Sequence, residues 1–352
     1  MAKLRIEGAW TALITPFEDN GDIDWDGLQR LVEFQLREGI SGLVPTGTTG
    51  ESPTLDWPDH EKVIGRVVKG SRAKCPVIAG TGSNSTEEAV DGTRHAARLG
   101  ADGALLVDCY YNGPSSKELR TEYHAVVAAA CPDIAIVPYV IPGRTGTALL
   151  PEDLAILAAE YPNVFAVKEA TGDLERMALT RSLVGPDFQI VSGDDSLIFE
   201  MMTAPAIAAS GVISVISNVL PRAVEAFTRR LLQGDREGVE HLRQGLDPMF
   251  GIVTVSVNNP RTLPGGRTAT VKDRFRNPLA IKTLMNGLGM PSGPCRRPLG
   301  KMTASAVQVV RQAARRSYEI EPDLFEPIEQ AFDVRVDERL REDKYWRALA
   351  QD

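Results

Sequence analysis

A lysine stands at the end of an apolar segment in the middle of this sequence. Residues 164–167, Val-Phe-Ala-Val, are typical of a short buried strand, and Lys168 follows them directly. Lysines usually keep their ammonium groups in solvent, so an exposed side chain is the simplest interpretation. The alternative is a nucleophile in a partly dry pocket, because burial lowers the pKa of an amine. The other polar residues of the chain bear on this choice.

Polar residues follow other apolar segments in the same way. In chain order they are Thr48 and Thr49, Tyr110 and Tyr111, Tyr139 and Arg144, and Gly193 in the motif SGDD. Each alone is also explained as a turn, a helix cap or a surface side chain. In a parallel barrel, however, the carboxyl ends of all strands meet at one face, where active sites are built. This shared position favours Lys168 as a nucleophile.

One reaction uses all of these groups. A neutral lysine amine attacks a ketone to form an imine, and the enamine derived from it attacks an aldehyde. Tyr139 can transfer protons, and the Gly-Thr-Thr-Gly turn that contains Thr48 and Thr49 can hold a carboxylate. Arg144 can bind a second carboxylate through two parallel hydrogen bonds. These residues predict an aldolase that acts on a 2-oxo acid and uses no metal or cofactor.

The elements that must position these residues repeat along the chain. Apolar, β-rich runs recur every ~20 to 35 residues, which is the length of a βα unit. The eight runs are residues 10–17, 41–47, 76–82, 103–108, 134–140, 164–169, 188–194 and 211–217. Their continuous apolar character predicts strands buried on both faces, so we expect an α/β fold of the (β/α)₈ TIM-barrel type. A doubly wound open sheet is the alternative, although no G-x-G-x-x-G motif follows the first run.

The sequence changes character after residue 221. Residues 1–221 are predicted to form the catalytic barrel, and residues 222–352 a helical C-terminal subdomain. Within this subdomain, residues 254–276 look like an insertion, with two β-branched runs around Leu-Pro-Gly-Gly that suggest a hairpin. From about residue 318 the chain continues as an extended tail that is charged but carries aromatic residues. The aromatic residues favour a docked tail over a disordered one.

Composition excludes several classes of protein. The 352 residues carry a net charge of −8 and no long basic block, which argues against a nucleic-acid partner. No run of about 18 apolar residues is present, so no membrane-spanning helix is expected. The four cysteines lack C-x-x-C spacing, which argues against a zinc site. The first residues lack the apolar core of a signal peptide, and a reducing, cytoplasmic location is the expectation.

Six motifs together carry a family resemblance. GTTGES, YYN, YVIPGRTG, VKEATGD, SGDD and GVISV stand in this order within residues 4–302. They resemble the dihydrodipicolinate synthase/N-acetylneuraminate lyase family of class I aldolases. The resemblance implies a lyase that condenses pyruvate with L-aspartate 4-semialdehyde, giving 4-hydroxy-tetrahydrodipicolinate in lysine biosynthesis.

Two residues favour this substrate pair within the family. The family's N-acetylneuraminate lyases typically have Gly-Ser-Thr-Gly in the first loop and no arginine at the place of Arg144, whereas this chain has Thr48 and Arg144. Val140 departs from the family's usual asparagine, and the insertion and the tail are extra. The alternatives are a lyase for N-acetylneuraminate or a 2-keto-3-deoxy sugar acid, and a non-catalytic protein that binds a 2-oxo acid.

The resemblance also implies a role for each residue of the site. Lys168 forms the imine, and Tyr139, Thr48 and Tyr111 form a proton relay, with Tyr111 entering from a neighbouring subunit of a homotetramer built as two tight dimers. The residues implied to bind substrate are Thr49 for the pyruvate carboxylate, Arg144 for the semialdehyde carboxylate, and Gly193 and Ile213 in the pocket wall.

A feedback site for L-lysine is a further implication of the resemblance. Its residues would lie at the dimer contact and are Ser52, Pro53, Trp57, His60, Asn84, Glu88 and Tyr110. Glu88 would pair with the ammonium group of the ligand. The alternative interpretation is that Glu88 belongs to a helix start and that Trp57 is a packing residue.

Overall fold

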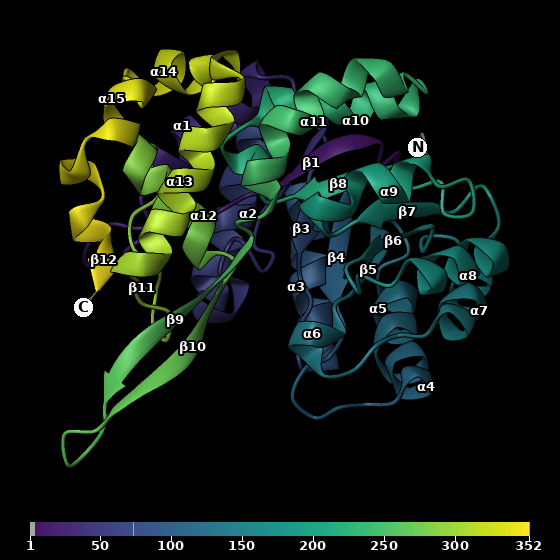
Figure 1. Ribbon diagram of the computed structural model, residues 1–352. Coiled ribbons are helices and arrows are strands. Elements are labelled where there is room, and N and C mark those ends of the chain that lie inside the picture. Colours follow the sequence, from purple (N-terminus) through teal and green to yellow (C-terminus); the bar gives the residue numbers. More distant parts are fainter. Residues whose placement is uncertain (1–3, 73, 352) are drawn as a thin grey trace.

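Eight parallel strands form one closed sheet in the computed structural model, which describes residues 4–72 and 74–351 (Figure 1). The strands follow the order β2-β1-β8-β7-β6-β5-β4-β3, and a parallel bridge between Leu43 and Val77 joins the two end strands. This closure confirms the predicted barrel over the open sheet. The strands are β1 (Gly8–Ala12), β2 (Gly42–Val44), β3 (Ile78–Gly80), β4 (Gly103–Val107), β5 (Ala135–Val140), β6 (Ala166–Glu169), β7 (Gln189–Ser192) and β8 (Gly211–Ser214).

The interior of the barrel is filled with side chains. All residues of β1 and β5 are buried, as expected for strands covered on both faces. Trp10 on β1 is fully buried and lies over Gly42 on β2. A Cβ at position 42 would lie 2.1 Å from the indole ring, so the barrel interior needs glycine there.

Helices cover the outside of the barrel. The helix predicted from the capping pattern at Ser85 is α3, in which the Ser85 hydroxyl accepts a hydrogen bond from the Glu88 amide and Gly100 ends the helix at φ +92°. The helices along the barrel are α1 (Trp25–Arg37), α2 (Trp57–Ser71), α3 (Thr86–Leu99), α4 (Ser116–Glu118), α5 (Ala125–Ala130), α6 (Pro142–Thr145), α7 (Pro151–Glu160), α8 (Leu174–Val184), α9 (Ile198–Thr203) and α10 (Pro221–Leu232).

The C-terminal part is mainly helical and packs beside one end of the barrel (Figure 1). Its apolar residues share one core with α1, α2 and α10. The proposed domain boundary at residue 221 falls at the start of α10, a helix that packs both on β1 of the barrel and on α11 of the C-terminal part. The elements after α10 are α11 (Arg236–Phe250), β9 (Thr254–Thr262), β10 (Thr268–Arg276), α12 (Leu279–Leu288), β11 (Met302–Thr303), α13 (Ala304–Ile320), α14 (Glu326–Phe332), α15 (Val336–Arg341) and β12 (Ala350–Gln351).

Two features of this part bear on the site. Strands β9 and β10 pair in antiparallel fashion and extend away from the body as a long hairpin, drawn in green in Figure 1. The last residues pack on the C-terminal part, because β12 pairs with β11 and the Trp346 side chain is buried against α12.

Among the described residues, no helix is both long and apolar enough to cross a membrane.

Candidate active site

Lys168 lies at the carboxyl end of β6 with its side chain inside the barrel. The side chain is 6 % exposed, and its Nζ lies 4.2 Å from the centre of the Tyr139 ring on the neighbouring strand β5. Burial lowers the pKa of Lys168 to about 7, against a smaller upward effect of the Asp195 carboxylate. A large fraction of the amine is therefore neutral near pH 7, which a nucleophilic lysine requires.

Asp195 provides the carboxylate that raises the pKa of Lys168 against the effect of burial. Its carboxylate is buried, accepts a hydrogen bond from the Val215 amide at 2.9 Å and is hydrogen-bonded to the Ser214 hydroxyl. Burial raises the pKa of Asp195 to about 6, so it is largely ionised at pH 7. Asp195 thus favours the protonated amine and moderates the effect of burial on Lys168.

Tyr139 and Thr48 form the next part of the site. Tyr139 is buried, and burial raises its pKa against smaller opposing effects of Arg144 and the Thr48 side chain. Thr48 comes from the loop that follows β2, so two strand ends meet here as predicted. A phenol next to both an amine and a hydroxyl can pass protons between them.

Arg144 and Thr49 are held by a residue from far along the chain. Arg144 on α6 donates from Nη2 to the Asn277 carbonyl oxygen at 2.8 Å. The Asn277 side chain in turn donates from Nδ2 to the Thr49 hydroxyl at 2.9 Å. Asn277, which directly follows β10, therefore links the loop after β2 to Arg144 on α6.

These residues surround a cavity of about 220 Å³. Six of the predicted site residues line it, namely Thr48, Thr49, Tyr139, Arg144, Lys168 and Gly193. A Cβ at position 193 would lie 3.0 Å from the Lys168 Cε, so glycine leaves room for the lysine chain. Asp194, Arg274, Arg276 and Asn277 also line the cavity.

Two predicted residues lie elsewhere in the single chain. Tyr111 follows β4, has φ +75° and is 93 % exposed, and it does not line the cavity. Ile213 on β8 is 1 % exposed and packs in the barrel interior with Trp10 and Val191 rather than in the cavity wall.

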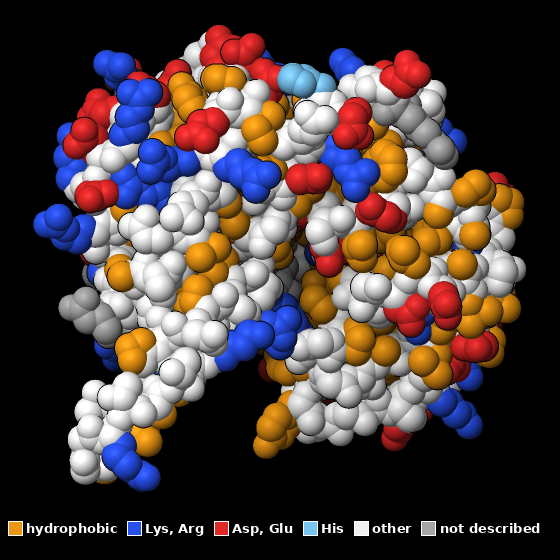
Figure 2. Space-filling view, in the orientation of Figure 1, with side chains coloured by type: hydrophobic (Ala, Val, Ile, Leu, Met, Phe, Trp, Pro, Cys, Tyr) orange, Lys and Arg blue, Asp and Glu red, His pale blue; other side chains and the backbone are white. Residues whose placement is uncertain are grey.

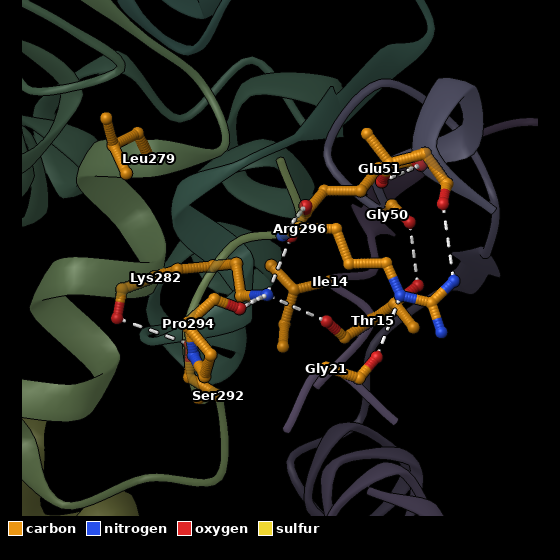
Figure 3. Close-up of polar contacts among 12 residues, drawn as sticks. Ile14, Thr15, Gly21, Gly50, Glu51, Leu279, Lys282, Ser292, Pro294 and Arg296 are labelled. Atoms are coloured by element: carbon orange, nitrogen blue, oxygen red, sulfur yellow. Dashed lines mark hydrogen bonds and ion pairs between the residues drawn. The ribbon is translucent and has the colours of Figure 1, made fainter. Parts of the chain in front are cut away.

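The loop that carries Thr48 and Thr49 is fixed by a buried ion pair (Figure 3). Glu51, at φ +58°, binds Lys282 of α12 at 2.7 Å, and both side chains are almost fully buried. Lys282 also donates to the carbonyl oxygens of Thr15 and Pro294, while the second Glu51 oxygen accepts from the Arg296 amide. The C-terminal part therefore holds the loop after β2 in its conformation.

Contacts within the single chain connect several of the residues predicted for L-lysine. The Ser52 hydroxyl lies 3.3 Å from the His60 ring, which packs against Trp57, and burial lowers the pKa of His60 to about 4. Glu88 accepts a hydrogen bond from Ser83, next to Asn84. Ser52, Pro53 and Tyr110 line a small cavity of about 50 Å³, which also reaches Thr48 and Tyr139.

Several residues of the site were not predicted from the sequence. Asn277, Arg274 and Arg276 lie in or beside the segment that looked like an insertion, and the arginines suggested only a solvated face. Asp194 and Asp195 were visible in the SGDD motif, but a loop-to-helix cap explains that motif equally well, and Asp194 does cap a short helix.

Comparison with known proteins agrees with the geometry of the site. Residues 5–266 match the model of the dihydrodipicolinate synthetase family. The chain belongs to this family. A 4-hydroxy-tetrahydrodipicolinate synthase of Geotalea uraniireducens is 41% identical over 313 residues, which cover 89% of this chain and 98% of the relative.

Solved structures of the dihydrodipicolinate synthetase family share the fold. The 4-hydroxy-tetrahydrodipicolinate synthase of Methylacidiphilum fumariolicum is 32% identical, with a TM-score of 0.81 over 93% of this chain and 100% of that chain. A dihydrodipicolinate synthase of Cyanidioschyzon merolae with lysine bound is 34% identical, with a TM-score of 0.78 over 88% of this chain and 98% of that chain. The family predicted from the six motifs and the class, a lyase-type class I aldolase, are confirmed.

Proposed function

We propose that this protein condenses pyruvate with L-aspartate 4-semialdehyde to give 4-hydroxy-tetrahydrodipicolinate, a step of lysine biosynthesis. The observation that carries the proposal is the buried Lys168, whose pKa of about 7 leaves a neutral amine beside Tyr139. The names of the curated relatives support the same reaction.

The chemistry follows from the order of the groups around the cavity. The Lys168 amine attacks the ketone carbon of pyruvate, water leaves, and an imine remains on the lysine. Loss of a proton from the methyl carbon gives an enamine, whose carbon attacks the aldehyde and leaves the product bound to Lys168 as an imine. The amino group that came with the aldehyde then attacks the imine carbon, which closes the ring and releases the Lys168 amine. Tyr139 and Thr48 transfer the protons, and Arg144 binds the carboxylate of the aldehyde.

Borohydride trapping tests this proposal. The protein is reduced in the presence of pyruvate and digested, and the peptides are analysed by mass spectrometry. We expect a pyruvate-derived mass on the Lys168 peptide. Lys282 is the internal control, because it is also buried but is paired with Glu51. No label, or a label on the Lys282 peptide in place of the Lys168 peptide, would overturn the assignment.

The choice of substrate is tested by rate. Turnover of pyruvate with aspartate semialdehyde is compared with cleavage of N-acetylneuraminate and of 2-keto-3-deoxygluconate. We expect the first reaction to be the fastest by a wide margin. Faster cleavage of a sugar acid would replace the proposed substrate, and no turnover with any of them would favour a binding protein.

The exposed Tyr111 supports the proposed homotetramer of two tight dimers. A tyrosine that is 93 % exposed in the single chain can enter the cavity of a neighbouring copy and complete the relay there. Light scattering is expected to give the mass of a tetramer. A dilute monomer with full activity in a rate assay would contradict this arrangement. We also propose a cytoplasmic location, in keeping with four free cysteines among the described residues.

Feedback by L-lysine is the last part of the proposal. The site would lie at the dimer contact, and three of its residues, Ser52, Pro53 and Tyr110, line a small cavity that also reaches Thr48 and Tyr139, so binding beside it can affect the proton relay. Titration with L-lysine at fixed pyruvate is expected to inhibit turnover, and Glu88→Ala to weaken the inhibition. Glu87→Ala is the matched control on the same turn of α3. Equal inhibition of both variants and the parent protein would exclude Glu88 from the site.

A further inference from the structure

The base of the β9–β10 hairpin brings positive charge to the mouth of the cavity. Arg274 and Arg276 of β10 line it together with Arg144. Arg276 donates from Nη1 to the Gly143 carbonyl oxygen at 2.7 Å, which places it next to α6. In Figure 2, blue side chains gather in the hollow where the base of the hairpin meets the barrel. The hairpin is thus part of the site and not only an outward projection.

These arginines lack an anionic partner within the described chain. Arg261 on the same hairpin pairs with Asp273 at 2.7 Å, but no carboxylate among the described residues pairs with Arg144, Arg274 or Arg276. Asp194 is the one carboxylate among the described residues of the cavity wall, and it already accepts hydrogen bonds from Ser196. The mouth therefore holds more positive charge than the chain neutralises.

The proposed aldehyde does not balance this charge. Aspartate semialdehyde carries one carboxylate and one ammonium group, and Arg144 alone can bind that carboxylate. Two further guanidinium groups would repel the ammonium group, and they also repel Arg144. Unpaired arginines that converge on one cavity are suited to a ligand with an additional negative charge. Both residues lie beyond residues 5–266, which match the family model.

We infer that Arg274 and Arg276 form, beside Arg144, an anion subsite for a second carboxylate, so that the cavity binds 2-oxo dicarboxylates. The 2-oxo group of such a ligand reaches Lys168, and its distal carboxylate lies between the hairpin arginines. This inference deepens the proposed function and rests on it, because both use the imine on Lys168. A 2-oxo dicarboxylate would then compete with pyruvate and make the enzyme sensitive to this class of compound.

Two ligands of equal chain length test the subsite. 2-Oxoglutarate has a carboxylate where 2-oxopentanoate has a methyl group, and both can form an imine with a lysine. Inhibition of pyruvate turnover by each compound gives two inhibition constants. We expect 2-oxoglutarate to bind at least about tenfold more tightly, as is typical for hydrogen bonds to a charged group. The preference is expected to fall as salt is added.

Variants assign the preference to the hairpin. In the double variant Arg274→Ala/Arg276→Ala, the inhibition constant for 2-oxoglutarate is expected to rise about tenfold, while the inhibition constant for 2-oxopentanoate stays unchanged. The ratio of the 2-oxopentanoate constant to the 2-oxoglutarate constant therefore falls about tenfold. Arg267→Ala at the exposed tip of the same hairpin is the control for one lost charge, and it is expected to keep the ratio. Equal binding of the two compounds to the parent protein, or an unchanged ratio in the double variant, would overturn the inference.

The result is separable from the proposed function. Borohydride trapping with pyruvate alone reports on Lys168 and does not involve a second carboxylate. If pyruvate is trapped but the two 2-oxo acids bind equally, only the subsite fails. If pyruvate is not trapped on Lys168, the proposed function fails first.

Discussion

Replacing Lys168 by methionine is expected to stabilise the folded protein while it abolishes imine formation. The wild-type lysine has a pKa of about 7 in the folded state, against an ordinary value of 10.5, because it is buried. Each pKa unit corresponds to about 1.4 kcal/mol, so holding this lysine in the folded state costs about 4 kcal/mol at pH 7. Methionine has a similar length and no charge to desolvate.

The pKa of about 7 already includes the attraction between Lys168 and Asp195, so the expected gain is the whole of this cost, about 4 kcal/mol at pH 7. Between pH 7 and 10.5 the unfolded lysine binds more protons than the folded one, so the stability of the wild type rises with pH in this window. At pH 9 the cost has fallen to about 2 kcal/mol, so the advantage of the variant should fall by about half.

Urea unfolding at pH 7 and pH 9, at one protomer concentration, measures both quantities. Lys282→Met is the matched comparison, because Lys282 is also buried but is paired with Glu51. Its loss leaves a buried carboxylate unpaired and is expected to destabilise the protein by about 3 to 5 kcal/mol. A Lys168→Met variant that is destabilised at pH 7, or a stability difference that does not change with pH, would refute the reasoning.

Three further predictions concern activity. The initial rate of pyruvate trapping is expected to rise with pH and to be half-maximal near pH 7, the pKa of Lys168; a rate that is equal at pH 6 and pH 8 would contradict the assigned cause. Tyr111→Phe is expected to lower turnover by about 100-fold while the imine still forms, as measured by trapping and steady-state kinetics; unchanged turnover would exclude the relay role. Arg144→Ala is expected to lower kcat/KM for aspartate semialdehyde by about 10- to 100-fold with little change in pyruvate trapping; an equal loss in both measurements would contradict a role specific to the aldehyde.

The barrel and much of the site were predictable because their signals are local. Each of the eight apolar runs contains or overlaps a strand. The end of such a run, or the position directly after it, is where Lys168, Tyr139 and Thr48 stand. The carboxyl ends of parallel strands share one face, so sequence position alone placed these residues together. Ile213 shows the limit of this argument, because it belongs to the same interior cluster as Tyr139 and still does not line the cavity. The sequence does not specify which of the inward-facing side chains reach the cavity.

The contacts that complete the site join residues far apart in sequence. Asn277 binds Thr49 across 228 positions, and Lys282 binds Glu51 across 231 positions. Neither residue lies in a pattern that indicates chemistry, since Lys282 stands in an apolar helix and Asn277 precedes a proline. Such pairings depend on how the C-terminal part packs on the barrel, which periodicity and turn signals do not specify.

The two buried lysines show what the sequence leaves open and the structure decides. Both stand in apolar surroundings, Lys168 after Ala-Val and Lys282 after Ala-Ile, so local pattern does not distinguish them. Lys282 has a carboxylate at 2.7 Å and two carbonyl oxygens, which hold it as a charged structural group. Lys168 faces the Tyr139 ring and an open cavity. Burial disfavours its protonated form, and no carboxylate among the described residues forms an ion pair with it. Burial lowers the pKa of both lysines, but at Lys282 the Glu51 carboxylate opposes the shift. Lys168 has no such ion pair in the part of the chain that the structure describes, and the cavity beside it admits the ketone that its neutral amine attacks.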